Sequence, residues 1–325
     1  MNSEKELLIE INRSCHLECK FCSSNADEKS LCQLNLNQIN SILDDSERLK
    51  ISKIEISGGE PFVHPDFLKI CKSISDHKIK YQVYTSGNIK KNGILIPLPL
   101  NTLKKLKALK IASLRFNLQS HIPKIHNFLT NSESFENTLS SIRKAIKLDI
   151  PTEVHIIPLK QNYLKLIRTI KFLENLNVSR IKFLRFVAHG RGSANRRYLE
   201  LNSNQYFSLI RNLIVYKHIY HDFIEISSSF NNSIINKTSN ICRNCQLGRR
   251  KIVITPDGSV FPCVSTKNLK IFEFNLDEYS LQQILISKGY QNRVDEYIWK
   301  SFKSQEEKLH FINLCPTQNY LNSTN

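Results

Sequence analysis

The chain has 325 residues, of which 41% are hydrophobic, and 46 Lys and Arg against 29 Asp and Glu give it a formal net charge of +17. This length allows one large domain with a smaller companion, and the absence of a run of about eighteen apolar residues excludes a membrane-spanning helix. Nine cysteines behind an opening segment without signal-peptide character predict a reducing cytoplasm, where clustered cysteines serve as metal ligands rather than disulfides.

Short apolar runs alternate with longer stretches of helical period up to about residue 227, which is the pattern of βα units around a parallel sheet. The predicted strands are Glu6 to Ile11, Lys53 to Ser57, Lys80 to Thr85, Ile111 to Asn117, Thr152 to Ile157 and Arg180 to Phe186. The predicted helices are Leu36 to Leu49, Pro65 to His77, Leu103 to Lys110, Phe135 to Asp149, Tyr163 to Asn175 and Ser203 to His218. Right-handed crossovers of this size predict an incomplete barrel, with its chemistry at the carboxyl ends of the strands.

The pattern changes after Ser227, where a polar connection leads into a different kind of unit. Lys251 to Cys263 reads as a β-hairpin, because an apolar strand is followed by the turn Asp257-Gly258 and a second strand. We therefore expect an α/β fold, a partial (βα)6 TIM-like barrel over residues 1–235, with a small α+β domain over residues 236–325.

Three cysteines follow the first predicted strand, with the spacing C-x3-C-x2-C: Cys15, Cys19 and Cys22. Thiolates bind zinc and iron–sulfur clusters alike, but structural zinc needs four ligands, and the next cysteine, Cys32, lies ten positions further on. A disulfide framework is possible in principle. The spacing favours a four-iron cluster with one iron left open to a small molecule.

A second motif, Ser57-Gly-Gly-Glu-Pro61, follows the second predicted strand. Together the two motifs resemble those of the radical S-adenosylmethionine (SAM) enzymes over nearly the whole chain. The resemblance implies that the three cysteines hold a [4Fe-4S] cluster, that SAM chelates the open iron, and that Gly58, Gly59, Glu60 and Pro61 contact its methionine end. It also implies that Phe21 lies near the adenine, although ordinary loop packing would equally explain this aromatic residue.

Further contacts with SAM are implied at the ends of later strands. The candidates are Ser86 and Asn88 after the third strand, Gln119 and Ser120 after the fourth, and Arg185 at the sixth, where a guanidinium can bind a carboxylate in bidentate fashion. Each could instead be an ordinary turn or surface residue. His126 is expected on a surface helix and His189 near the substrate.

A second cysteine set comprises Cys242, Cys245, Cys263 and Cys315. It resembles the SPASM or twitch extensions of some radical SAM enzymes and implies one auxiliary [4Fe-4S] cluster, with either Cys315 or substrate completing it. A zinc knuckle is the competing interpretation, because four cysteines also satisfy tetrahedral zinc. Cys32 and Cys71 are expected to be packed or spare thiols.

The resemblance implies an enzyme that cleaves SAM reductively and abstracts hydrogen with the 5′-deoxyadenosyl radical, using an electron donor such as flavodoxin or ferredoxin. A ribosomally synthesised peptide is the preferred substrate. Because only fourteen residues precede Cys15, a separate recognition protein or the basic surface would have to bind its leader. The alternatives are a nucleotide or other small molecule, as in molybdopterin-precursor synthases, and a non-catalytic iron–sulfur carrier or sensor.

The positive charge can attract acidic peptides, nucleotides or nucleic acid, but a Lys-, Asn- and Ile-rich composition also arises from an AT-rich genome. The densest basic run, Lys104 to Lys110, has leucines at helical spacing and no interleaved aromatic residues. It therefore predicts a solvated helix face and argues against nucleic acid as a partner.

Overall fold

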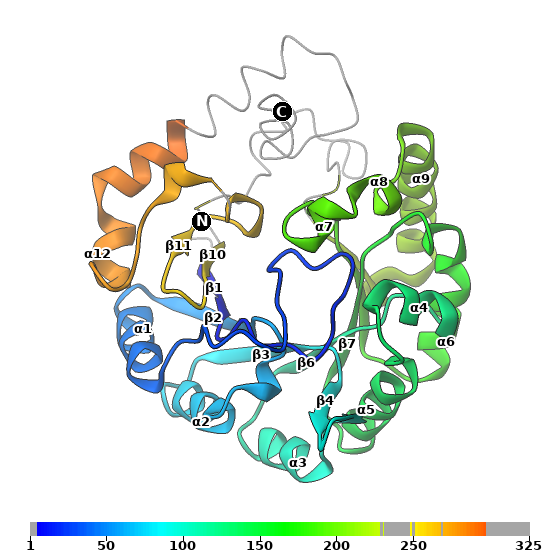
Figure 1. The fold of residues 1–325 in the computed structure, drawn as a ribbon, viewed down its shortest axis with the longest axis horizontal. Helices are drawn as coiled ribbons and strands as arrows, with labels where there is room; N and C mark the ends of the chain where they lie inside the picture. The colour runs from blue at the N-terminus through cyan, green and yellow to red at the C-terminus, as the bar shows by residue number, and fades with distance from the viewer. Residues whose placement is uncertain (1–4, 228–229, 231–247, 249–250, 268, 297–325) are drawn as a thin grey trace.

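The computed structural model describes residues 5–227, 230, 248, 251–267 and 269–296 (Figure 1). Within this part of the chain, nine strands form one curved sheet in the order β11-β10-β1-β2-β3-β6-β7-β8-β9. All neighbours are parallel except β10 and β11. The strands are β1 Lys5–Glu10, β2 Ile51–Ser57, β3 Lys80–Thr85, β6 Ser113–Asn117, β7 Thr152–Ile156, β8 Arg180–Phe183, β9 Ile224–Ile226, β10 Lys251–Ile254 and β11 Val260–Phe261.

Most of the helices cover the outside of the curved sheet, as in a partial barrel, whereas α7 and α8 lie at its rim (Figure 1). The helices are α1 Leu36–Arg48, α2 Phe67–Asp76, α3 Leu100–Ala108, α4 Pro123–Thr130, α5 Phe135–Lys147, α6 Leu166–Asn175, α7 Arg191–Ala194, α8 Arg196–Leu199, α9 Ser203–Tyr220 and α12 Leu281–Ile286. The six predicted strands and six predicted helices are confirmed, with ends shifted by a few residues. None of the helices described is both long and apolar enough to cross a membrane.

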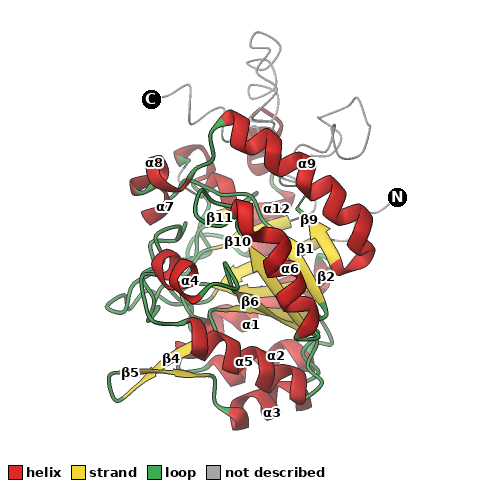
Figure 2. Ribbon diagram, turned by 90° about the vertical axis from the view of Figure 1, so that its right-hand side faces the viewer, coloured by secondary structure: helices red, strands yellow, loops and turns green. Residues whose placement is uncertain are grey.

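Several short elements were not predicted: α4, α7, α8, α12, strand β9, and a separate hairpin of β4 Asn88–Lys91 and β5 Ile94–Pro97. Figure 2 shows this hairpin projecting from the body of the barrel. Helices α7 and α8 have only four residues each, too few for a periodic apolar pattern to appear in the sequence.

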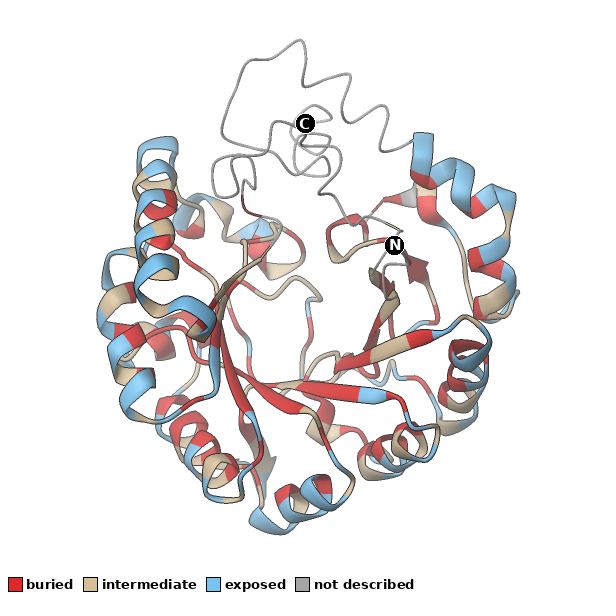
Figure 3. Ribbon diagram, turned by 180° about the vertical axis from the view of Figure 1, so that it is seen from behind, coloured by how far each residue is buried: buried red, intermediate tan, exposed pale blue. Residues whose placement is uncertain are grey.

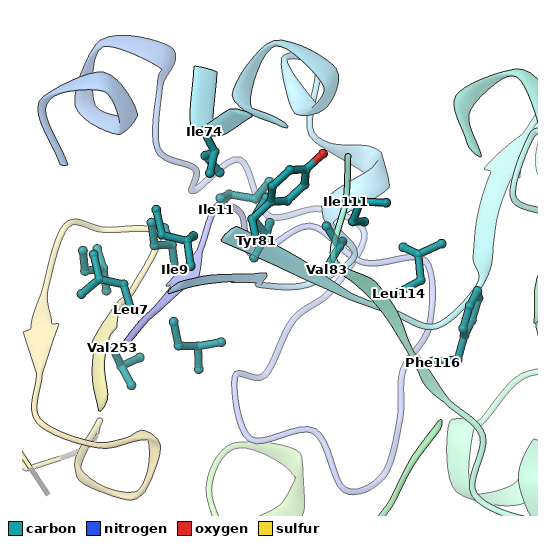
Figure 4. Packing of buried hydrophobic residues seen from close by; sticks show 14 of the residues in the cluster. Leu7, Ile9, Ile11, Ile74, Tyr81, Val83, Ile111, Leu114, Phe116 and Val253 are labelled. Atoms are coloured by element: carbon teal, nitrogen blue, oxygen red, sulfur yellow. The ribbon is translucent and has the colours of Figure 1, made fainter. Parts of the chain in front are cut away.

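The two faces of the sheet differ in chemistry. Residues that face the helices are apolar and buried, including Leu7, Ile9, Val83, Leu114 and Phe116 (Figures 3 and 4). Residues that alternate with them point into the barrel and are mostly polar or charged, because successive side chains of a strand point to opposite faces. The outer face supplies the core, and the inner face is available for chemistry.

Cations and carboxylates pair across the inside of the barrel. Arg115 Nη1 lies 2.6 Å from Glu55 Oε1, and Arg115 Nε lies 3.0 Å from Glu153 Oε2. Similar pairs join Lys53 to Glu6 at 2.8 Å, Lys182 to Glu225 at 2.5 Å, and Lys251 to Glu55. Strand β10 therefore contributes a lysine to the lining of the barrel.

The predicted hairpin after residue 250 is confirmed, with Val253 opposite Phe261 and Ile254 opposite Val260. Its first strand, β10, pairs in parallel with β1, so the hairpin continues the barrel sheet beyond its first strand. The predicted domain boundary at residues 235–236 lies outside the described residues.

Candidate functional site

The loop that carries the three cysteines leaves β1 and runs directly against the glycine pair. Gly59 N donates to Asn12 O at 2.7 Å, and Glu60 N donates to Ser14 O at 2.8 Å. A Cβ on Gly58 would lie 2.4 Å from Asn12 O, and one on Gly59 would lie 2.0 Å from Ser14 O. Both glycines are thus needed because two backbones approach closely here, a reason the sequence alone did not reveal.

The three cysteines are free thiols of this loop, and Cys19 and Cys22 stand on one turn, where Cys22 N donates to Cys19 O at 3.1 Å. Burial, followed by the nearby Glu60 carboxylate, raises the pKa of the Cys15 thiol to about 12. Burial, followed by the charges of Cys15 and Cys22, raises the pKa of Cys19 well above its usual value. A positively charged partner is therefore needed to hold thiolates here, as a metal does.

The three thiols are a donor set that suits an iron–sulfur cluster. Thiolates bind zinc and iron–sulfur clusters alike, but structural zinc needs four ligands. Three cysteines leave one iron of a four-iron cluster open. Cys15, Cys19 and Cys22 therefore fit such a cluster by their chemistry and their number.

Glu60 is buried and connects the glycine turn to the turn after β3. Its Oε1 accepts from Thr85 Oγ1 at 2.7 Å, and its Oε2 accepts from Ser86 N at 2.8 Å and Ser86 Oγ at 2.7 Å. Burial raises the pKa of Glu60 even though these groups and Phe62 N donate to it. The structure therefore brings Gly58, Gly59, Glu60 and Ser86 together, with Glu60 holding the turn of Ser86.

Asn88 and the pair Gln119 and Ser120 are also buried at this rim. Asn88 Nδ2 donates to Ser86 O at 2.9 Å, and its buried Oδ1 has no partner in the part of the chain that the structure describes. Gln119 Oε1 accepts from Ile157 N at 2.9 Å, and Ser120 Oγ accepts from Ile122 N at 3.1 Å. In this structure Gln119 and Ser120 stabilise the turn after β6, and their contact with SAM remains a prediction.

The segment after β8 holds the cysteine loop from the opposite side. Arg191 Nε donates to Cys19 O at 3.0 Å, Asn195 Nδ2 donates to Lys20 O at 3.2 Å, and Gly192 N donates to Cys22 O at 3.2 Å. A Cβ on Gly190, where φ is +52°, would lie 2.9 Å from Cys22 O. Sequence reasoning missed these residues, although the two glycines around Arg191 were a signal of close backbone approach.

Phe21 belongs to a small apolar cluster beneath the cysteine loop. Its buried members are Leu17, Cys19, Phe21, Leu129, Leu159, Phe186 and Leu199. This packing explains why an aromatic residue precedes the last cysteine, and the predicted contact of Phe21 with adenine stays a prediction. His126, expected on the surface, is instead buried on α4, where its Nδ1 accepts from Gln119 N at 3.2 Å.

Of the second cysteine set, only Cys263 lies within the described residues; Cys242, Cys245 and Cys315 lie outside them. The loop of Cys263 is bound to the rim of the barrel. His189 Nε2 lies 2.9 Å from Ser265 O, and the buried Lys267 Nζ lies 2.7 Å from Glu10 Oε1 and 2.9 Å from Ser24 Oγ. Cys263 is therefore on the same rim as the first three cysteines, tied to their loop through Ser24.

Arg185 lines a cavity of about 220 Å³ at the ends of β7 and β8. The cavity is bounded also by Pro158, Phe186, Tyr206 and Phe230, and the rings of Tyr206 and Phe230 stack with centroids 6.4 Å apart. Arg185 Nε is buried and has no hydrogen-bond partner among the described residues. A guanidinium in this setting can bind an anionic group that enters the cavity.

This combination of a partial barrel, a loop with three cysteines and an interlocked glycine turn defines a cluster-binding enzyme fold. The chain belongs to the radical SAM superfamily, whose family profile matches residues 9–173, and an iron-sulfur cluster-binding (SPASM) domain matches residues 242–317. It is an enzyme of that superfamily, with a [4Fe-4S] cluster that binds SAM and an auxiliary iron–sulfur cluster. The alternative of a non-catalytic carrier or sensor is therefore wrong.

Among curated proteins, a probable GTP 3′,8-cyclase of Methanocaldococcus jannaschii is 30% identical over 173 residues, which are 53% of each chain. The chain thus spans about half the length of that relative. Among solved structures, SuiB of Streptococcus suis bound to S-adenosylmethionine superposes with a TM-score of 0.73 at 15% identity, covering 90% of this chain and 68% of SuiB. The enzyme anSMEcpe with bound AdoMet and a peptide gives 0.72 at 16% identity, covering 96% and 88%. These likenesses confirm the fold.

Proposed function

We propose that this radical SAM enzyme abstracts a hydrogen atom from a ribosomally synthesised peptide and so modifies it. When bound, the first cluster and SAM supply the 5′-deoxyadenosyl radical that takes the hydrogen atom. Cys15, Cys19 and Cys22 would hold that cluster, and the turns of Gly58 to Pro61 and of Ser86 to Asn88 would orient SAM. Cys263, with Cys242, Cys245 and Cys315, would hold the auxiliary cluster.

The observation that carries the peptide assignment is the distribution of charge inside the barrel. Four cations inside the barrel, Lys53, Arg115, Lys182 and Lys251, and Lys267 at its rim each have a carboxylate partner. Arg185 is the guanidinium at the cavity for which the structure describes no such partner. One guanidinium without a carboxylate partner among the described residues, beside aromatic side chains, suits a single carboxylate of a peptide better than the several negative charges of a triphosphate.

The nucleotide alternative is favoured by sequence similarity, since the curated relative is named as a GTP cyclase. A nucleoside triphosphate would have to displace internal carboxylates from their cations, at the cost of leaving those carboxylates buried and unpaired. The peptide-bound neighbour anSMEcpe has the greater coverage of this chain, and its fold accommodates a peptide. We therefore place the nucleotide second.

The partners follow from this chemistry. Reductive cleavage of SAM needs a one-electron donor, for which we propose flavodoxin or ferredoxin, and a separate protein would recognise the peptide leader. A reducing, cytoplasmic location is proposed as well, in keeping with the free thiols among the described cysteines.

The test is SAM cleavage by the anaerobically reconstituted enzyme with each substrate class. A peptide encoded by a short reading frame beside this gene should stimulate the formation of 5′-deoxyadenosine, and the mass of that peptide should change. GTP should do neither. Consumption of GTP with no effect of the peptide would reverse the order of the two hypotheses.

A further inference from the structure

We propose that the surface formed by Lys160, Arg196, Arg197 and Tyr198 is the docking site for the acidic protein that reduces the first cluster. We call it the α8 face, because three of these residues belong to α8. The proposal rests on the reductive chemistry of the proposed function and does not depend on whether the substrate is a peptide.

The α8 face carries positive charge that the described residues leave unneutralised. Lys160 and Arg197 are exposed, and neither forms a salt bridge with a described carboxylate. Lys160 Nζ donates instead to Arg197 O at 2.8 Å, which holds the Lys160 ammonium against the backbone of α8. Arg196 has an acidic partner within the described part of the chain, Glu200 Oε2 at 2.6 Å.

The shape of this face suits a partner protein. Lys160, Ser193, Arg196 and Arg197 line a shallow depression of about 610 Å³. Next to it the ring of Tyr198 is 67% exposed, which is high for an aromatic residue of this size. Exposed aromatic and arginine side chains together are typical of protein interfaces, and a cationic surface speeds encounter with an acidic partner.

The α8 face lies close to the loop that would hold the first cluster. Figure 1 shows α7 and α8 beside the loop that carries the cysteines. Arg191 and Asn195 bond the carbonyls of Cys19 and Lys20, and Leu199 of α8 packs in the same buried apolar cluster as Cys19. Because electron transfer slows steeply with distance, a donor must dock where a short path leads to the cluster, and this face is backed directly by the cysteine loop.

Two acidic residues lie in the elements around this face. Glu18 is exposed within the cysteine loop, whereas Glu200 is engaged by Arg196. On the other side of the loop, Lys20 Nζ lies 5.2 Å from the ring centroid of Phe128, which is 48% exposed, and so continues the pattern of cations beside aromatic rings. The partner is therefore an acidic protein with a low-potential flavin or iron–sulfur centre. It loses one electron, and the cluster held by the cysteine loop gains it.

The first measurement is the dissociation constant of oxidised flavodoxin for the reconstituted enzyme. The double variant K160E/R197E should weaken binding at least about tenfold, because it reverses two charges at the contact. The matched control is K104E/K105E, which makes the same change of charge on exposed residues of α3 and should stay within about twofold of the wild type. Added salt should weaken binding by the wild type and have little effect on K160E/R197E.

The second measurement compares SAM cleavage driven by reduced flavodoxin with that driven by dithionite. K160E/R197E should lose about tenfold or more with flavodoxin and keep its dithionite-driven rate, which also shows that it is folded and loaded. The milder R197Q should show the same separation if the double variant does not fold. Equal losses for K160E/R197E and K104E/K105E, or unchanged binding, would overturn the proposal.

A lowered dithionite-driven rate that returns at high peptide concentration would assign the face to the substrate and likewise overturn it. Absence of any dithionite-driven cleavage in the wild type would instead count against the enzyme function itself. The failure of the docking surface and the failure of the function are therefore distinguished by the dithionite arm.

Discussion

On the β1 to β3 side of the barrel rim the backbones interlock, whereas on the β7 to β8 side a cavity opens between the strands and α9. The first side joins the cysteine loop, the glycine pair and the Ser86 turn through hydrogen bonds of 2.7–2.8 Å. The second side presents Arg185 to the cavity and carries the exposed cations of the α8 face. The side that carries the motifs common to the superfamily is thus fixed by backbone contacts, whereas the opposite side is the one to which we assign the proposed contacts with substrate and electron donor.

The largest effect is expected for Gly59→Ala on the interlocked side, since the added methyl would lie 2.0 Å from the backbone oxygen of Ser14. The cysteine loop must then shift, and a displacement of this kind can cost about 100-fold in rate. We expect the rate of SAM cleavage to fall by about 100-fold, together with a loss of cluster iron. The control is Gly289→Ala, where the methyl would meet only Ser287 Oγ at 3.9 Å. Full activity of the Gly59 variant would contradict the interlocked description.

Arg185→Met tests the opposite side. If Arg185 binds the substrate, formation of modified peptide should fall about 10- to 100-fold, as expected for a lost charge-assisted contact, while 5′-deoxyadenosine formation without peptide stays within about twofold. Product and 5′-deoxyadenosine are measured in the same reaction by mass spectrometry. Arg211→Met, on the exposed surface of α9, is the control. Weaker SAM binding would instead make Arg185 a SAM ligand, as the sequence predicted.

Glu60→Gln tests how much the carboxylate that joins the two turns contributes to stability. A Gln amide has one acceptor oxygen where the carboxylate has two, and its NH2 group cannot accept, so the donors of Thr85 or of Ser86 would be left unpaired in a buried site. We expect a loss of about 1–3 kcal/mol in the free energy of unfolding, measured by chemical denaturation. The exposed Glu18→Gln should change it by less than about 0.5 kcal/mol. A stable Glu60 variant would show that the turn is held by backbone contacts alone.

At His126, between the two sides, the expected effect appears only at acid pH. Burial lowers the pKa of His126 to about 4, against its usual 6.5, so the unfolded state binds more protons between these pH values. The free energy of unfolding should therefore fall as pH decreases from 6.5 to 4, by up to about 1.4 kcal/mol per pH unit from this residue. His126→Gln should flatten that dependence. An unchanged slope in the variant would assign the acid sensitivity to other groups.

The six main strands and helices could be predicted because a parallel sheet buried against helices produces apolar runs and helical periods in the sequence. The cysteine triplet and the Gly58 to Pro61 motif were equally visible. The glycine motif could be recognised in the sequence, but the contact of its glycines with Asn12 and Ser14 could not be predicted, because it depends on how two loops meet in space.

The rest of the site depends on contacts between distant residues. Helices α7 and α8 are specified by hydrogen bonds from Arg191 and Asn195 to the cysteine loop, and no local pattern encodes them. Strands β10 and β1 pair although more than 200 residues separate them in the chain, and the sequence of neither strand indicates its partner. Charges within the strands were visible in the sequence, but that Arg115 lies between Glu55 and Glu153 follows only from the register of the sheet.

The most direct test of a two-cluster radical SAM enzyme is iron content with 5′-deoxyadenosine formation, measured anaerobically for the wild type, Cys19→Ala and Cys263→Ala. Two four-iron clusters predict about eight irons per chain in the wild type and about four in each variant. Cys263→Ala should still cleave SAM under reduction, and Cys19→Ala should not. About four irons in the wild type without 5′-deoxyadenosine, or loss of SAM cleavage in Cys263→Ala, would contradict this account.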